Sequence, residues 1–223
     1  MIRHKSDHRF YFLNKTAQPS TWDAPAPRTV LRQLLAPGSC LIAPETPDGM
    51  LARMVALAGF DVAYVGMRGT ALNRIGSADA DLLTATELID NAARCIRTSG
   101  LPTLVDAGAG FGNAMNVRRT VEDLERAGAA GILLRDHADV PAYRQVARPL
   151  APEEMAAKLR AACDARRDSG LLVVAGLSPH APDGAERLSR YQDAGADLIH
   201  VGVIRDRAQA EALVGGIAGQ PLV

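Results

Sequence analysis

Apolar and polar residues alternate in blocks along the chain, and the stretch 101–136 contains one complete unit of the pattern. The run LPTLVD is too short for a helix and is typical of a buried strand that ends in a carboxylate. The glycine-rich turn AGAGFGN follows, and from Asn116 apolar residues recur at helical spacing until Gly128. GILLRD is a second apolar strand, so the stretch predicts a parallel βαβ unit.

The same unit recurs on both sides of this stretch. The predicted strands are SCLIAPE (39–45), DVAYVG (61–66), LPTLVD (101–106), GILLRD (131–136), LLVVAGLS (171–178) and DLIHVGV (197–203), and PLV (221–223) could open a seventh. The predicted helices are 29–35, 48–59, one that starts near Thr86, one from Asn116, 151–170, 186–195 and 205–219. Strands and helices therefore alternate throughout, as in the α/β class.

Sequential parallel strands without a reversal favour a (β/α) TIM-type barrel, whose functional site lies at the carboxyl ends of the strands. An open doubly wound sheet is the alternative. GAGFG lacks the spacing of a dinucleotide-binding loop, so we reject that interpretation. We assign residues 1–27 to an N-terminal extension and residues 28–223 to the barrel domain.

Two polar, irregular stretches interrupt the alternation. We interpret residues 67–87 as a long loop before the helix that starts near Thr86, and residues 137–150 as a second loop. Long connections in compact domains are often functional, so both stretches are candidates for the site.

The composition narrows the class of partner. Lys+Arg and Asp+Glu both number 25, so no net charge attracts nucleic acid or an anionic membrane surface. No apolar run approaches the length of a membrane span, and no signal peptide is indicated. The three cysteines are scattered, so we expect reduced thiols, a cytoplasmic location and a small-molecule site.

The segment DAGAGFGNAMNVRRTVEDLERAGAAGI resembles the isocitrate lyase and phosphoenolpyruvate mutase superfamily, whose members usually read DADTGYGN, a helix rich in VxRTVxxLExAG, and GIxIED. The likeness extends over residues 31–223. It implies a β/α barrel that acts on small 2-oxo acids or related anions through a magnesium-stabilised enolate. A dication held by carboxylates offsets the charge that develops on an enolate oxygen.

Carried over residue by residue, the resemblance makes Asp106 the direct Mg²⁺ ligand and places Asp79 on the loop after the second strand. Asp136 also matches the family. The other metal-site carboxylates are replaced, one by Gly108 and one by Arg135.

Substrate-binding positions of the family also differ. Its arginine and aspartate after the fifth strand fall at Gly176 and Ser178, and its glutamate after the sixth falls at Gly202. Its Ser-Gly pair after the second strand falls at Gly66 and Met67. The loop that carries the acid/base cysteine of isocitrate lyases is missing, so ordinary isocitrate cleavage is not expected.

Side chains alternate along a strand, so Asp106, Arg135, Ser178 and His200 are predicted to face the barrel axis. Our central hypothesis is that Arg135 takes over the position and charge of the metal, pairs with Asp106 and presents donors to a substrate anion. The alternative is that the charges of Asp106 and Arg135 only neutralise each other and have no role in function.

Further candidates surround this pair. Arg68 could bind a second carboxylate, or be a solvated loop residue, and His137 could be a general acid or base, or a surface histidine. We list Asp106, Arg135, Asp79 and His137 as catalytic candidates, and Gly66, Met67, Arg68, Asp136, Ser178 and His200 as substrate-binding candidates.

Two functions remain open. The first is a lyase-type enzyme that acts on a small 2-oxo or dicarboxylic acid by C–C or C–P bond chemistry, with weak or no dependence on Mg²⁺. The second is a non-catalytic barrel that serves as a binding or scaffold subunit. We favour the enzyme because Asp79, Asp106 and Asp136 are all present. Since the family generally has eight strands, we expect a barrel that is incomplete at its C-terminus and a homo-oligomer that covers the open edge.

Overall fold

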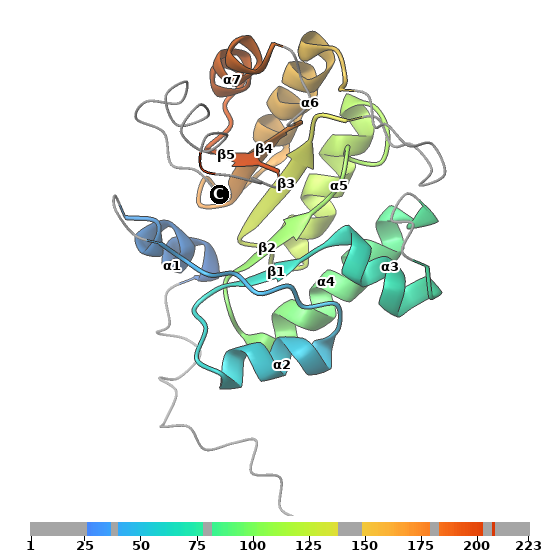
Figure 1. The fold of residues 1–223 in the computed structure, drawn as a ribbon, viewed down its shortest axis with the longest axis vertical. Helices are drawn as coiled ribbons and strands as arrows, with labels where there is room; N and C mark the ends of the chain where they lie inside the picture. Colours follow the sequence, from blue (N-terminus) through green and yellow to red (C-terminus); the bar gives the residue numbers. More distant parts are fainter. Residues whose placement is uncertain are drawn as a thin grey trace, which may run out of the picture.

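The computed structural model describes residues 26–36, 40–77, 82–137, 149–178, 183–202 and 207 (Figure 1). The described strands are β1 (Ala63–Val65), β2 (Thr103–Asp106), β3 (Gly131–Arg135), β4 (Leu172–Leu177) and β5 (Leu198–Val201). The helices are α1 (Pro27–Leu34), α2 (Gly49–Leu57), α3 (Met67–Ile75), α4 (Ala85–Ser99), α5 (Ala114–Arg126), α6 (Pro152–Ala165) and α7 (Gly184–Asp193). This is the predicted α/β alternation.

The strands form one sheet in the order β1-β2-β3-β4-β5, and every neighbouring pair is parallel. Sequential order with helical crossovers is the arrangement that the repeated βαβ pattern predicts. An open doubly wound sheet would reverse its strand order at a switch point, and the described strands show no reversal. The carboxyl ends of all five strands consequently lie along one edge.

The two faces of the sheet pack against different partners. Figure 1 shows α4, α5 and α6 along one side of the strands and α1 on the other. The larger apolar cluster joins the helices to the sheet and includes Val105, Ile132 and Val173. The smaller cluster lies on the opposite face, where Leu31 of α1 packs with Leu104 and other strand residues. Because side chains alternate along each strand, both faces are apolar and the strands are buried.

Helix α1 is tied to the amino ends of the strands by two arginines. Arg28 donates to the backbone oxygens of Glu125 and Ala129, and Arg32 donates to those of Ser169 and Gly170. These oxygens lie in the last turn of α5 and in the segments that lead into β3 and β4. Helix α1 therefore covers the edge of the sheet opposite to the strands' carboxyl ends.

Two sequence predictions were wrong. Among residues 40–45, which belong to the predicted strand SCLIAPE, only Glu45 forms a bridge, with Tyr64. Pro44 has no N–H to donate, which limits a regular ladder here. The stretch after β1 was predicted as loop, yet Met67–Ile75 form α3. Its good helix formers outweigh Gly69, and Gly76 ends the helix with φ of 66°.

Other boundaries follow recognisable signals. Thr84 and Glu87 form a capping box at the start of α4, close to the predicted start at Thr86. Asn113 begins α5 in the same way. The predicted helix 205–219, apart from Arg207, and the strand 221–223 lie outside the described residues, as do residues 1–25 of the predicted extension. None of the helices in the described part of the chain has the length and apolar character of a membrane span.

Candidate functional site

Four polar side chains lie on the α1 face of the sheet, near the carboxyl ends of four of the five described strands. They are Tyr64 on β1, Asp106 on β2, Arg135 on β3 and His200 on β5. In the strand register Arg135 lies opposite Gly176, and Gly176 lies opposite His200. These three positions are level across the sheet, and the middle one has no side chain.

Asp106 is the centre of this group and is only 2% exposed. Its Oδ1 accepts hydrogen bonds from Gly108 N at 3.0 Å and from Arg135 Nε at 3.1 Å. Its Oδ2 accepts from Tyr64 Oη at 3.0 Å and from Arg135 Nη2. Both oxygens of this buried carboxylate are thus engaged by the protein.

The glycine-rich loop makes one of these contacts possible. Gly108 has φ of 56°, a conformation that residues with a Cβ resist, and its N–H turns back to the Asp106 carboxylate. The Gly108 carbonyl accepts from Arg135 N at 2.7 Å. The loop therefore holds both the carboxylate and the strand that carries the arginine.

Arg135 is more accessible than Asp106, with a side chain that is 37% exposed. Burial disfavours its charge, but the Asp106 carboxylate outweighs burial and raises the Arg135 pKa. Nε and Nη2 face Asp106, and no described residue accepts a hydrogen bond from Nη1. The pair thus holds a permanent cation, the guanidinium, at the carboxyl end of β3.

Tyr64 is a site residue that the sequence analysis missed. Burial, reinforced by Asp106, raises the pKa of its phenol, so the hydroxyl remains neutral and donates to the carboxylate. Arg135 Nη2 in turn lies 3.4 Å from Tyr64 Oη. A signal was available, because Tyr64 is two positions before the candidate Gly66 and strand alternation puts both on one face.

His200 is half-buried on the same face. Burial and the positive charge of Arg135 lower its pKa, so the imidazole is neutral at neutral pH. Gly176, which lies between Arg135 and His200 in the register, has no side chain to separate them. His200 can therefore offer either a donor or an acceptor next to the arginine.

Asp136 lies in a different environment from Asp106. It is fully buried, and its carboxylate accepts from Ser178 N at 2.6 Å and Tyr191 Oη at 2.8 Å. Arg187 Nη1 lies 3.4 Å from Oδ2. Tyr191 and Arg187 belong to α7, so Asp136 and the Ser178 backbone join the ends of β3 and β4 to that helix. Strand alternation explains why Asp136 and its neighbour Arg135 face opposite sides.

The remaining candidates are spread around the edge. Gly66 and Met67 are buried where α3 begins, whereas Arg68 is exposed. His137 forms an isolated bridge with Pro149 just beyond β3. Asp79 lies outside the described residues, so the structure does not test its predicted position.

A divalent metal does not fit the donors around Asp106. Mg²⁺ needs several oxygen ligands, but the Asp106 carboxylate already accepts hydrogen bonds from Arg135 and Tyr64. The positive charge beside it is the guanidinium of Arg135, which would repel a metal ion. Among the described residues no group of three His, Cys, Asp or Glu side chains could hold a metal ion. The side chains present thus favour direct recognition of an anion by Arg135.

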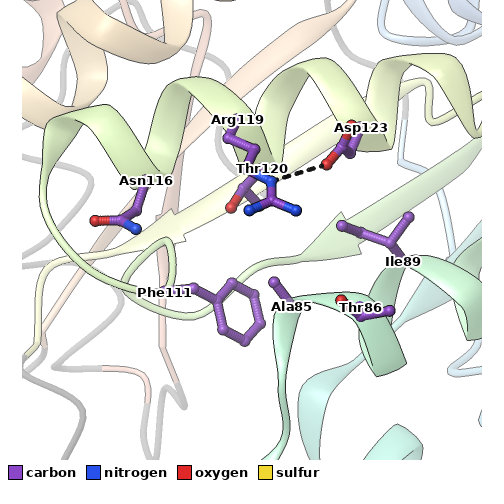
Figure 2. Close-up of a pocket in the computed structure, with 8 residues that line it drawn as sticks. All are labelled: Ala85, Thr86, Ile89, Phe111, Asn116, Arg119, Thr120 and Asp123. Atoms are coloured by element: carbon purple, nitrogen blue, oxygen red, sulfur yellow. Dashed lines mark ion pairs between the residues drawn. The ribbon is translucent and has the colours of Figure 1, made fainter.

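A separate hollow of about 110 Å³ lies between α4, α5 and the glycine-rich loop (Figure 2). Phe111 and Ile89 line it, and Arg119 and Asp123 form an ion pair of 3.6 Å beside it. Phe111 has φ of 60°, which is uncommon for a residue with a side chain. None of the site candidates that the structure describes lines this hollow. An exposed ion pair such as Arg119–Asp123 contributes little to stability.

Comparison with known proteins identifies the family. The family model described as phosphoenolpyruvate phosphomutase matches residues 31–223. An oxaloacetate decarboxylase of Rhodopseudomonas palustris (strain ATCC BAA-98 / CGA009) is 38% identical over 192 residues, which cover 83% of this chain and 66% of that protein. Oxaloacetate decarboxylase 1 of Pseudomonas putida (strain W619) is 37% identical over 195 residues, covering 86% and 68%. The chain thus spans about two thirds of the length of these curated relatives.

Solved structures agree with this result. A crystal structure of 2,3-dimethylmalate lyase matches with a TM-score of 0.81 at 30% identity, covering 89% of this chain and 71% of that one. Oxaloacetate acetylhydrolase in complex with the product oxalate matches with a TM-score of 0.80 at 30% identity, covering 88% and 70%. The chain belongs to the phosphoenolpyruvate mutase and isocitrate lyase superfamily.

Proposed function

We propose that this protein is a lyase-type enzyme that acts on a small 2-oxo or dicarboxylic acid of the oxaloacetate class through an enolate-like intermediate, with weak or no dependence on Mg²⁺. The carrying observation is the Asp106–Arg135 pair, in which a buried carboxylate fixes a half-exposed guanidinium. The names of the relatives support the substrate class.

We propose further that the five strands belong to a β/α barrel. The expected homo-oligomer and cytoplasmic location stay predictions.

The reaction that suits this site is decarboxylation. In oxaloacetate the C3–C4 bond breaks, C4 leaves as CO₂, and the electron pair forms the C2–C3 double bond of pyruvate enolate. A proton from water then adds to C3 and gives pyruvate. Arg135 Nη1 donates to the C2 oxygen, where negative charge develops.

The geometry of Arg135 suits this role better than that of an unrestrained surface arginine would. Asp106 holds Nε and Nη2 side by side, which fixes the plane of the guanidinium before a ligand arrives. Since an arginine stays protonated at any physiological pH, its charge does not depend on a metal. The neutral hydroxyl of Tyr64 and the neutral imidazole of His200 add polarity without adding opposing charge.

The test is pyruvate formation from oxaloacetate in EDTA, with the uncatalysed rate subtracted, for the wild type, Arg135→Ala and Arg135→Lys. We expect metal-free turnover in the wild type, loss of at least a hundredfold in Arg135→Ala, and partial retention in Arg135→Lys. Arg119→Ala is the matched control, because Arg119 is an arginine on α5 that is 82% exposed and pairs with Asp123 instead of Asp106. Activity that appears only with Mg²⁺ would contradict the role given to Arg135.

The non-catalytic alternative has one observation in its favour, since every oxygen of Asp106 is already paired within the protein. A protein of this kind would show no turnover. Thermal unfolding with oxalate, in EDTA and in Mg²⁺, separates the cases. A stabilisation that persists in EDTA and disappears in Arg135→Ala, without turnover, would favour an anion-binding subunit.

A further inference from the structure

Glu45 lies beside the candidate site, although it belongs to no regular strand. Its backbone forms a parallel bridge with Tyr64, supported by bonds from Tyr64 N to the Pro44 oxygen and from Thr46 N to the Tyr64 oxygen. Residues that are paired in a parallel bridge point to the same side of the sheet. Glu45 therefore projects to the face that carries Tyr64 and Asp106.

The Glu45 carboxylate is seated against the start of α3. Its Oε1 accepts a hydrogen bond from Gly69 N at 3.1 Å. A Cβ at Gly66 would lie 2.3 Å from this oxygen, and a Cβ at Gly69 would lie 2.5 Å from it. Neither glycine has a positive φ, so backbone conformation does not require glycine at these positions. The missing side chains instead leave the space that the Glu45 carboxylate fills.

The start of α3 is a natural position for a carboxylate. Its N-cap residue is Gly66, which has no side chain to accept from the first N–H groups. The positive end of the helix dipole also points there. Glu45 supplies the acceptor from another segment, which shows that the backbone of α3 binds a carboxylate and that the chain's own carboxylate occupies this place.

This position is next to the candidate site. A Cβ at Gly66 would lie 2.3 Å from Oε1 of Glu45 and 3.1 Å from Cε1 of Tyr64, so the carboxylate and the phenol ring approach the same point. Tyr64 in turn donates to Asp106. Glu45 is exposed and borders an open groove of about 420 Å³ that Gly69 and Leu72 also line, so a ligand can reach it.

We infer that Glu45 is a specificity-determining residue, which excludes a substrate's second carboxylate from the N–H groups of α3. This inference rests on the proposed function. A 2-oxo acid would then be held by Arg135, while its distal carboxylate is kept from the backbone N–H groups at the start of α3 and faces the like charge of Glu45. In an oxaloacetate-like acid this unpaired carboxylate is the group that leaves as neutral CO₂.

The experiment compares two four-carbon ligands in EDTA by calorimetric titration. These are 2-oxobutyrate, which has one carboxylate, and 3,3-difluorooxaloacetate, which has two. In Glu45→Ala, which frees Gly69 N, we expect the dicarboxylate to bind about tenfold more tightly and 2-oxobutyrate to change by less than twofold. Glu45→Gln keeps the acceptor but removes the charge, so we expect a selective gain of about threefold. This variant also serves if Glu45→Ala does not fold.

Glu87→Ala is the matched control, because Glu87 caps α4 with the same chemistry. It should lower stability and leave both affinities unchanged. Equal changes for the two ligands in the Glu45 variants, or no change, would overturn the inference and would leave a capping role. If neither ligand binds to the wild type or to any variant, the inference fails together with the proposed function. Binding that requires Arg135 but ignores Glu45 overturns the inference alone.

Discussion

Arg135 engages both carboxylate oxygens of Asp106, with Nε 3.1 Å from Oδ1 and Nη2 on Oδ2. The two residues end neighbouring strands and are separated by 29 positions in the sequence. Only the carboxylate is fully buried, while the guanidinium remains partly open to solvent. The buried carboxylate therefore fixes a guanidinium cation at the edge of the sheet, and this arrangement supports several measurements.

A double-mutant cycle should detect the coupling between these two residues. With Asp106→Asn and Arg135→Met, we expect a coupling of about 1–2 kcal/mol in the free energy of unfolding, reduced by the exposure of the arginine. The exposed pair Glu122 and Arg126 on α5 is the control and should give about 0.3–0.5 kcal/mol. Equal values for the two pairs would argue against a special role for the buried carboxylate.

Replacing Tyr64 by Phe should weaken the fold and change its response to alkali. Loss of the hydroxyl that donates to Asp106 should cost about 1 kcal/mol at pH 7. Because the folded state raises the pKa of this phenol, its contribution is complete below the unfolded pKa of about 10 and is lost as pH rises further. Urea unfolding at pH 8 and pH 10.5 should thus show a smaller alkaline loss in Tyr64→Phe than in the wild type.

The pH dependence on the acid side should report on His200. Its pKa is lowered in the folded state, so the unfolded chain binds a proton more readily. Its contribution to stability is complete above about pH 6.5 and is lost as pH falls from there through the folded pKa. We expect His200→Asn to flatten the decline of unfolding free energy between about pH 6.5 and 5. An unchanged slope would place the imidazole in solvent.

The glycine-rich loop should not tolerate a side chain at position 110. Gly110 has φ of 87°, and a Cβ there would lie 2.4 Å from Cγ2 of Val117. Gly110→Ala should therefore lower stability by about 1–3 kcal/mol. Gly184→Ala in α7 is the control, since among the described residues the added Cβ would meet only Leu177, at 3.9 Å, and the change should be neutral or slightly stabilising. Chemical unfolding of both variants checks the contrast.

Asp136 should matter for stability rather than for anion binding. Asp136→Asn weakens the buried contacts with Arg187 and Tyr191, and we expect a loss of about 3 kcal/mol. Asp183 also pairs with Arg187, but its side chain is 31% exposed, so Asp183→Asn should cost less than about 1 kcal/mol. Oxalate affinity of the folded Asp136→Asn protein should equal that of the wild type. A selective loss of affinity would restore the substrate-binding role predicted for Asp136.

Much of the fold was readable from periodicity. The strands from DVAYVG to DLIHVGV appear where short apolar runs predicted them, and the helix start predicted near Thr86 and the stop predicted at Gly128 lie near observed helix ends. These features are local, since they depend on side-chain spacing within a few residues. Helix α3 was missed because its glycine and polar residues are typical of a loop. Its first turn is completed by Glu45, which lies 24 positions away and cannot be recognised by local spacing.

The site shows the same division. Alternation along the strands placed Asp106, Arg135 and His200 on one face, and their proximity follows from parallel pairing. The sequence does not reveal that Tyr64 reaches Asp106 or that Glu45 occupies the start of α3. Alternation puts Asp136 on the opposite side from Arg135, but the sequence does not reveal that its carboxylate binds Tyr191 of α7. Those contacts depend on how the ends of different strands and helices pack in space, so distances and burial were needed to assign them.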